Sequence, residues 1–179
     1  MISQEEIQVG DTAVFVNRTL PARELSLHTS LQFLDAITLS GLLDYRGDFV
    51  VWNFTESYRC QSLLCSAVMN PNAPLWEQAR AVALFQHKSA TPYGYLEDGS
   101  FWRLRELSLS WELPDDWSRA WGASRTALTI AGRNLATWTD YSGLDPEVNW
   151  DGGSSNFETV DGFTQPPLRY WTARVTVSF

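Results

Sequence analysis

The sequence predicts an all-β fold built from antiparallel strands that each have one apolar and one polar face. Three observations support this class. Five segments alternate between apolar and polar residues, the connections between them alternate between short and long, and Trp is abundant, with 9 among 179 residues. An aromatic content of 13% is high for a typical soluble enzyme, so the aromatic residues need an explanation of their own.

The first two segments form a predicted hairpin. In the predicted strand 24–34 the odd positions are apolar apart from Thr29, and the even positions from Glu24 to Gln32 are polar. The same pattern resumes in residues 36–46, where Leu42 is the one apolar residue on the polar face. A tight turn at Asp35-Ala36 joins the two strands.

Three further strands are predicted at residues 101–113, 124–134 and 169–179. In the first of these the alternation changes phase at Arg105-Glu106, which indicates a β-bulge. The last strand has the most regular alternation and ends at the last residue of the sequence.

The connections differ strongly in length. Residues 35–36 and 114–123 are short links, whereas residues 47–100 and 136–168 are long, polar and rich in Asn, Gly, Pro and Trp. Within the first long connection, residues 74–88 carry apolar side chains at helical spacing after a proline, which predicts one short loop helix.

Short turns at one end, long loops at the other and one apolar face per strand are typical of antiparallel transmembrane β-barrel strands with long extracellular loops. The alternative is a soluble antiparallel sandwich, which the alternation alone fits equally well. Connections of this length are uncommon in compact sandwiches and favour the barrel. Aromatic residues near the strand ends fit the interfacial girdles of a barrel: Tyr45, Trp102, Trp111, Trp138 and Trp171.

Charge and histidine content exclude several other classes of function. A formal net charge of -8 argues against nucleic acid as a partner. The carboxylate pairs Asp145/Glu147, Glu97/Asp98 and Asp115/Asp116 lie in predicted turns, where solvated loop acids are the favoured interpretation. His28 and His87 lie in different elements, so we expect no catalytic residues, no enzyme activity, no metal site and no cofactor.

Two smaller motifs remain open. Cys60 and Cys65 enclose four residues in a long loop, and the spacing fits a local disulfide and two free thiols equally well. Residues 2–6 resemble the second half of a calcium loop with Glu6 at its last position, but the preceding ligands are absent, which favours an acidic loop end.

Longer motifs resemble a known family. GYLEDGSFWRLRELSLSWELP (residues 94–114), AGRNLATWTDYSGLDPEVNW (131–150) and QPPLRYWTARVTVSF (165–179) resemble, in this order, the C-terminal end of SusC/RagA-type TonB-linked (TonB-dependent) outer-membrane transporters. The earlier LPARELSL and LSGLLDYRGDFVVWN stretches and the WEQAR segment (76–80) are also similar to that family.

The resemblance implies a larger barrel of about 22 strands with a plug, which imports glycans, peptides or similar nutrients into the periplasm. It implies location in the outer membrane and, as partners, outer-membrane lipid, the barrel-assembly machinery, a SusD-like lipoprotein and TonB. Residues 1–9 show no signal peptide, and the plug and the TonB contact region have no counterpart here. We therefore expect a C-terminal barrel fragment that is not active alone, with residues 1–23 as a loop remnant and 24–179 as barrel segment.

The expected site residues follow from this topology. Substrate or partner contacts are expected in the extracellular loops, at Trp76, Trp138, Asp140, Tyr141, Asp145, Glu147 and Trp150. An assembly signal is expected on the apolar face of the last strand, at Trp171, Val175, Val177 and Phe179. The rival from another class is a secreted carbohydrate-binding β-sandwich module whose exposed Trp residues stack on sugars.

Overall fold

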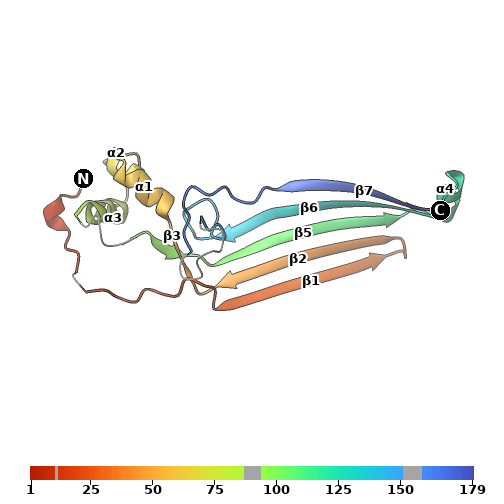
Figure 1. Ribbon diagram of the computed structural model, residues 1–179, viewed down its shortest axis with the longest axis horizontal. Helices are drawn as coiled ribbons and strands as arrows, with labels where there is room; N and C mark the ends of the chain where they lie inside the picture. Colours follow the sequence, from red (N-terminus) through yellow and green to blue (C-terminus); the bar gives the residue numbers. More distant parts are fainter. Residues whose placement is uncertain (11, 87–93, 151–158) are drawn as a thin grey trace. The chain divides into compact units, whose positions relative to one another are not determined.

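A computed structural model describes residues 1–10, 12–86, 94–150 and 159–179 (Figure 1). The chain divides into two compact units. Unit 1 contains Met1–Ala22, Gly47–Ser100 and Asp140–Pro166, and unit 2 contains Arg23–Arg46, Phe101–Thr139 and Pro167–Phe179. Across the described residues, no helix combines the length and the apolar character needed to cross a membrane.

Unit 2 is a five-stranded sheet with the strand order β1-β2-β5-β6-β7. Its strands are β1 (Arg23–Phe33), β2 (Ile37–Gly47), β5 (Phe101–Glu112), β6 (Arg125–Thr139) and β7 (Tyr170–Ser178). Neighbouring strands from β2 to β7 pair antiparallel. Among the described residues β1 and β7 are the two edges, so the strands form an open sheet and not a closed barrel.

The hairpin between β1 and β2 turns one residue earlier than predicted. Leu34 and Asp35 both have positive φ, 50° and 54°, and the Ala36 N–H donates to the Phe33 carbonyl at 3.2 Å. Two central residues with positive φ define a type I′ turn, whose twist matches that of the flanking strands. The sequence pattern misplaced the turn because turns of this type usually contain Asn or Gly, and neither is present here.

The predicted bulge in β5 is confirmed by the strand register. Leu42 pairs with Glu106 and Leu43 with Leu104, so Arg105 is an extra residue on β5. The same residue is skipped in the pairing with β6. This extra residue keeps Leu104 on the same face as Leu107, which explains the change of phase seen in the sequence.

Strand β6 continues five residues beyond its predicted end at residue 134. Its register with β5 shifts between Arg133 and Ala136, and Asn134 has a positive φ of 52°. The irregularity interrupts the alternation, and the sequence pattern therefore suggested a strand end. After it, Thr137 and Trp138 pair with Arg103 and Trp102.

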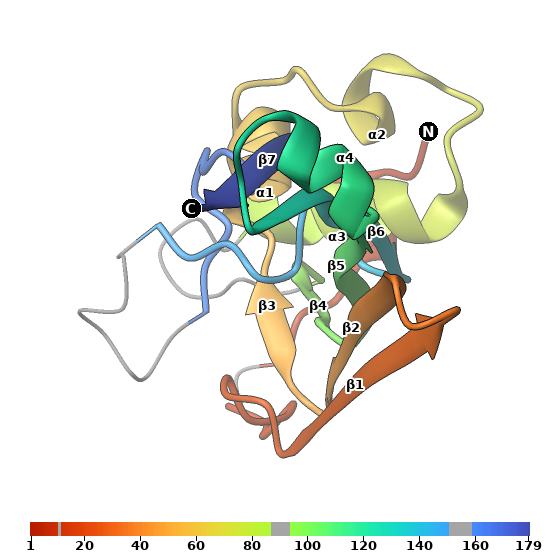
Figure 2. The same ribbon diagram turned by 90° about the vertical axis from the view of Figure 1, so that its right-hand side faces the viewer.

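The link between β5 and β6 contains a helix that the sequence analysis assigned to a turn. Helix α4 (Asp115–Ala120) begins after Pro114, and the Ala123 N–H donates to the Ser118 carbonyl at its end. Figure 2 shows α4 at the end of the sheet where β5 leads to β6. The Trp111 and Trp117 rings meet edge-on with centroids 6.0 Å apart.

The two faces of the sheet differ in chemistry. On one face the register aligns apolar side chains across strands, as in the row Leu39, Leu109, Ile130 and Ala173. Leu107, Leu109 and Val175 on this face are 39%, 46% and 65% exposed, so no part of the described chain covers it. Apolar side chains in rows of this kind are normally the inside of a core.

The opposite face is polar and internally paired. Arg105 Nε lies 2.7 Å from Asp44 Oδ2, and Arg133 Nε lies 2.9 Å from Glu106 Oε2. Arg125 and Glu112 form a third ion pair. Cross-strand pairs of opposite charge support the observed register.

One glycine on the apolar face is required by a close approach. A Cβ atom at Gly132 would lie 2.8 Å from the Trp171 ring. Gly132 and Trp171 are register partners on β6 and β7. The indole ring therefore lies flat against the neighbouring strand, which a larger residue would prevent.

Unit 1 is a small mixed assembly. It contains the 3-10 helix η1 (Gln4–Glu6), the two-stranded sheet of β3 (Val50–Trp52) and β4 (Leu96–Asp98), and three helices: α1 (Phe54–Gln61), α2 (Ser66–Met69) and α3 (Leu75–Gln86). The predicted loop helix at 74–88 corresponds to α3, with residues 87–88 outside the described part. The core of unit 1 consists of Cys60, Cys65, Ala67, Ala81, Leu84 and Tyr95.

Helices α1 and α2 were not predicted. Helix α1 lies in FTESYRCQ, where β-branched, aromatic and Cys residues give low helix propensity. It forms because Asn53 caps it, accepting the Glu56 N–H at 3.0 Å, and because its Cys60 packs in the core of unit 1. Packing of a short helix outweighs weak local propensity.

Candidate functional site

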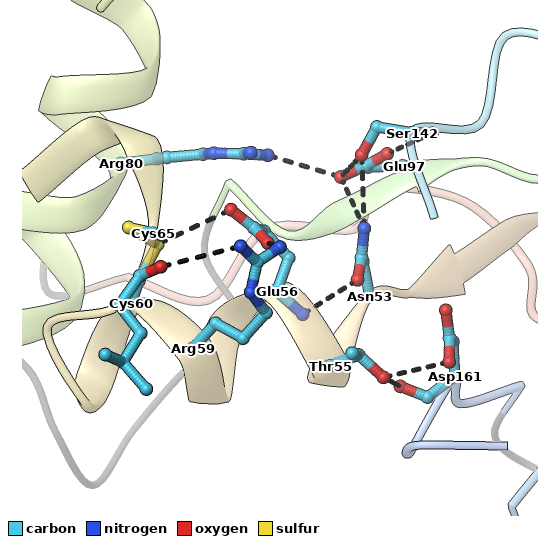
Figure 3. Close-up of polar contacts among 11 residues, drawn as sticks. Asn53, Thr55, Glu56, Arg59, Cys60, Cys65, Arg80, Glu97, Ser142 and Asp161 are labelled. Atoms are coloured by element: carbon cyan, nitrogen blue, oxygen red, sulfur yellow. Dashed lines mark hydrogen bonds and ion pairs between the residues drawn. A yellow bond between two sulfur atoms is a disulfide. The ribbon is translucent and has the colours of Figure 1, made fainter. Parts of the chain in front are cut away.

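A cluster of polar side chains in unit 1 centres on Glu97 of β4 (Figure 3). The Asn53 amide donates to Glu97 Oε1 at 3.2 Å, and Ser142 donates through its hydroxyl and its backbone N–H, both at 2.9 Å. Asn53 also donates to the Ser142 hydroxyl at 3.1 Å. Glu97 thus joins β4, the start of α1 and the segment after β6 through charge-assisted hydrogen bonds.

Arg80 of α3 supplies the cation next to Glu97. Its Nη1 lies 3.2 Å from Glu97 Oε1 and donates to the Gly94 carbonyl at 3.3 Å. The guanidinium also lies over two rings, 4.8 Å from the Trp76 centroid and 4.7 Å from that of Tyr95. Arg80 and Tyr95 are both buried, so the contact between them is shielded from water and is therefore stronger, whereas the Trp76 ring on the other contact is exposed.

A second buried carboxylate, Asp161, lies at the start of α1. It accepts hydrogen bonds from the Thr55 hydroxyl and the Tyr141 hydroxyl, each at 3.0 Å. Burial and the negative charge of Asp161 raise the pKa of Tyr141 well above its usual value. Tyr141 therefore stays a neutral hydrogen-bond donor.

Tyr95 has a different environment from Tyr141. Its ring is completely buried, and its hydroxyl has no hydrogen-bond partner within the described part of the chain. Burial raises the pKa of Tyr95 to about 12, and the nearby Arg80 charge lowers it only in part.

Next to these groups lies an open polar pocket of about 370 Å³ in unit 1, lined by Arg80 and Asp161 but not by Glu97, Tyr95 or Tyr141. Both signs of charge line it, with Glu56 and Asp161 beside Arg59 and Arg80. Polar lining groups include Asn53, Thr55, Ser66 and Ser142. A pocket with donors, acceptors and both charges is suited to a polar or zwitterionic ligand.

Exposed aromatic rings form a second feature of unit 1. Phe54 is within 6.1 Å of the Tyr58 and Trp150 centroids and 5.9 Å from that of Phe163, and Tyr58 meets Phe163 edge-on at 5.2 Å. Tyr58, Trp150 and Phe163 are all exposed. A connected group of exposed rings can stack on sugar or peptide faces.

The structure separates the predicted loop residues. Trp76, Asp140 and Trp150 are exposed in unit 1, and Glu147 is half-buried there. Trp138 belongs to β6 of unit 2, where it pairs with Trp102, and not to a loop. Its place in the sheet corrects the expectation of a loop position.

Two members of the predicted set are buried. Tyr141 is 5% and Asp145 is 6% exposed, so neither faces solvent in this structure. Tyr141 bonds to Asp161, and Asp145 accepts the Glu147 N–H at 2.9 Å. Their role here is to shape the segment after β6.

Sequence reasoning missed the residues that line the polar pocket. None of the seven predicted loop residues lines it, whereas Asn53, Arg80 and Ser142 do. Glu97 was considered only as a turn acid. The useful signals were an Asn directly before a helix and an Arg on the buried face of α3.

Cys60 and Cys65 are joined as a disulfide at the end of α1. Glu56 lies close to both sulfurs, but disulfide sulfurs carry no thiolate to bind a metal. Glu6 accepts the Ser3 N–H at 2.6 Å within its own turn. In the described ranges, neither group therefore makes a metal centre.

The predicted assembly residues lie on β7 and just after it. Trp171, Val175 and Val177 point to the apolar face of the sheet together with their β6 partners, and Phe179 follows β7. All four side chains are exposed. Their spacing is that of one strand face.

Comparisons with known proteins give a consistent class. No family model matches the chain. The TonB-dependent receptor P3 of Formosa agariphila is 33% identical over 89 residues, and the TonB-dependent receptor P26 of the same organism is 36% identical over 88 residues. Each match covers 48% of the chain and 9% of the relative, so the chain spans a small part of the length of these receptors.

Solved structures of similar fold agree. A chain of the RagAB peptide importer in the 'closed-closed' state matches this chain at 19% identity and a TM-score of 0.56. The match covers 80% of this chain and 16% of the RagAB chain. The 'open-open' state matches 87% at 20% identity and a TM-score of 0.55, over 17% of that chain. The solved structures thus show that the chain has the fold of strands from a transporter barrel of this kind, and over about half of its length the chain is similar in sequence to TonB-dependent receptors.

Proposed function

We propose that this chain is a wall segment of an outer-membrane TonB-dependent transporter, with unit 2 in the bilayer and unit 1 on the extracellular side. It is not an enzyme and is not active alone. The observation that carries this proposal is the five-stranded sheet whose apolar face is exposed and whose polar face is ion-paired. Lipid-facing and lumen-facing residues alternate in this way in membrane barrels.

The length of the apolar face fits a bilayer. Trp102 pairs with Tyr45 and Trp138 near one end of the strands, and Trp111 lies nine residues further along β5. At about 3.3 Å per residue these steps span about 30 Å along the strand. A strand tilt of about 40° reduces this to about 23 Å, close to the apolar band of about 25 Å between the aromatic girdles of outer-membrane barrels.

The exposed apolar face also argues against the rival class. A β-sandwich buries the apolar face of each sheet against the other sheet. Here Leu107, Leu109 and Val175 remain exposed, and the described residues contain one five-stranded sheet and one two-stranded sheet. A secreted sandwich with this surface would aggregate, whereas lipid satisfies it.

The connections set the orientation. The strand register places three features at the same end of the sheet: the β1–β2 turn, the β5–β6 link and the end of β7. The long segments leave from the opposite end. Short connections of outer-membrane barrels are periplasmic and long ones extracellular. Unit 1 therefore contributes extracellular loops.

For the imported nutrient we propose peptides or glycans, in contact with the polar pocket and the exposed rings of unit 1. The similar RagAB protein is a peptide importer by name, and the mixed charges of the pocket suit the termini of a peptide. The exposed rings suit either class. A SusD-like lipoprotein over the loops, TonB as the energy source and the assembly machinery complete the partners.

A matched pair of variants in the full-length transporter tests the membrane face. We expect Leu107→Arg to cost about 2 to 4 kcal/mol of folding free energy in lipid, because it places a charge near the bilayer midplane. Ser108→Arg on the polar face should cost little. Folding titrations into lipid vesicles measure both values, and equal costs at the two positions would overturn the two-faced assignment.

A further inference from the structure

The apolar face of unit 2 is not flat at the strand ends that carry the short turns. A groove of about 420 Å³ opens there between the ends of β5, β6 and β7. Its walls include Trp111, Trp121, Leu128, Val175, Val177 and Phe179. The hollow forms because Thr126 and Val177, which pair across β6 and β7, are smaller than the aromatic residues around them.

The chemistry of the groove selects an apolar ligand. Thr126 supplies the one polar side chain apart from the indole N–H groups of Trp111 and Trp121. No charged side chain lines the groove. A polar ligand would lose its hydration here without gaining hydrogen bonds, whereas a hydrocarbon chain gains from burying its surface.

The position of the groove identifies the source of that chain. The row Trp111, Leu128 and Val175 continues the exposed apolar face onto the groove. Trp117 of α4 meets Trp111 edge-on, Trp121 after α4 lines the groove, and both Trp117 and Trp121 are exposed. Trp side chains are enriched where hydrocarbon meets head groups, so α4 marks the interface on this side.

The charges at this interface indicate the head group. Helix α4 carries Asp115 and Asp116 against a single cation, Arg119, which lies 3.6 and 3.7 Å from their carboxylates. All three side chains are exposed. The surplus carboxylate charge attracts an ammonium head group and repels an anionic one, although solvent screening keeps this preference small.

We propose that this groove holds one acyl chain of a phospholipid of the periplasmic leaflet, with its ammonium head group beside α4. The inference rests on the proposed function, since it requires the sheet to face lipid. It goes further, because it assigns a defined lipid site to one end of β5, β6 and β7. Elsewhere on the face, lipid contacts are unspecific.

Photo-crosslinking of the full-length transporter tests the site. The protein is reconstituted with phosphatidylethanolamine that carries a diazirine on one acyl chain, and labelled residues are mapped by mass spectrometry. We expect labelling to concentrate at Leu128 and Val175 relative to Leu109, which lies on the same face outside the groove. Thr126→Trp, which fills the groove, should abolish this enrichment, and the control Ile130→Trp should retain it.

The outcomes separate this inference from the proposed function. Equal labelling of Leu109, Leu128 and Val175 overturns the groove site while supporting the lipid-facing sheet. Absence of labelling at all three overturns both. A photoreactive residue at Thr126 that captures a second copy or an assembly protein in cells, and no phospholipid, also overturns the lipid assignment.

Discussion

Two buried tyrosines in unit 1 show how a single hydrogen bond determines what a side chain contributes. Tyr141 donates to Asp161 at 3.0 Å, whereas the Tyr95 hydroxyl has no partner among the described residues. Both rings are buried. A buried hydroxyl without a partner has lost its hydration without gaining a hydrogen bond. Removal of the hydroxyl group should therefore have opposite effects on stability at Tyr95 and Tyr141.

We expect Tyr95→Phe to be neutral or to stabilise unit 1, because Phe keeps the ring under Arg80 and removes only the hydroxyl. Tyr141→Phe should destabilise by about 1 to 3 kcal/mol, since it leaves the Asp161 carboxylate short of one donor. Hydrogen exchange of the α1 and α3 amides in the full-length protein measures both. A larger loss for Tyr95→Phe than for Tyr141→Phe would contradict this assignment.

The pKa of Tyr95 gives a prediction in pH. Since burial raises its pKa from 10.0 to about 12, the folded form keeps its proton in a range where the unfolded chain has lost it. The unfolded state then binds fewer protons, so stability falls as the pH rises from about 10 to about 12 and is unaffected below this range. Local hydrogen exchange against pH should show this fall, and Tyr95→Phe should reduce it; an identical pH profile in the variant would refute it.

At the scale of the elements, the sequence predicted those parts that periodicity controls. All five strands of unit 2 were found, and the phase change located the bulge at Arg105. The errors lie where the backbone leaves the alternating pattern. Leu34 and Asp35 adopt positive φ without Gly, and the irregularity at Asn134 conceals the last part of β6.

The polar cluster of unit 1 escaped prediction for a different reason. Its polar cluster joins Asn53 and Glu97, 44 residues apart, and Glu97 and Ser142, 45 residues apart. No periodicity relates residues at such distances, and each looks like an ordinary loop residue by itself. The pairing of β3 with β4 brings Asn53 and Glu97 together, and the hydrogen bonds from Ser142 join the segment after β6 to them.

The disulfide between α1 and α2 stabilises this packing. We predict that unreduced, alkylated protein from outer membranes shows Cys60 and Cys65 bonded in mass spectrometry, because both sulfurs are buried in one core. Replacing both residues by Ala should destabilise unit 1 by about 2 kcal/mol, the value for closing so short a loop. The strands of unit 2 should keep their protection against hydrogen exchange. Two freely alkylated thiols would rule the disulfide out.

At the scale of the whole molecule, the five-stranded sheet has surfaces that are unfavourable in water. Its apolar face is exposed, its two edges lack partners among the described residues, and its polar face is already paired internally. Each of these features becomes favourable in a closed barrel within a bilayer, where neighbouring strands pair the edges and lipid covers the face. The sequence predicts such a two-faced sheet because the alternation of apolar and polar residues is a property of each strand by itself.

The proposed assembly signal lies at the end of β7. Trp171, Val175, Val177 and Phe179 place apolar side chains at alternate positions on one strand face, a pattern suited to recognition by β-augmentation. Phe179 is 90% exposed and therefore closes no core within the described chain. Its contribution should accordingly appear in the rate of insertion and not in stability.

We predict that deleting Phe179 from the full-length transporter leaves folding in detergent and the melting temperature unchanged, yet slows or abolishes insertion in cells. Leu34→Ala is the matched control, since Leu34 is equally exposed, at 90%, but lies in the β1–β2 turn away from β7. Pulse-chase measurement of heat-modifiable barrel in outer membranes gives the insertion rate. Normal insertion of the deletion variant combined with a lower melting temperature would show that Phe179 acts by packing, because loss of a recognition residue changes only the assembly step.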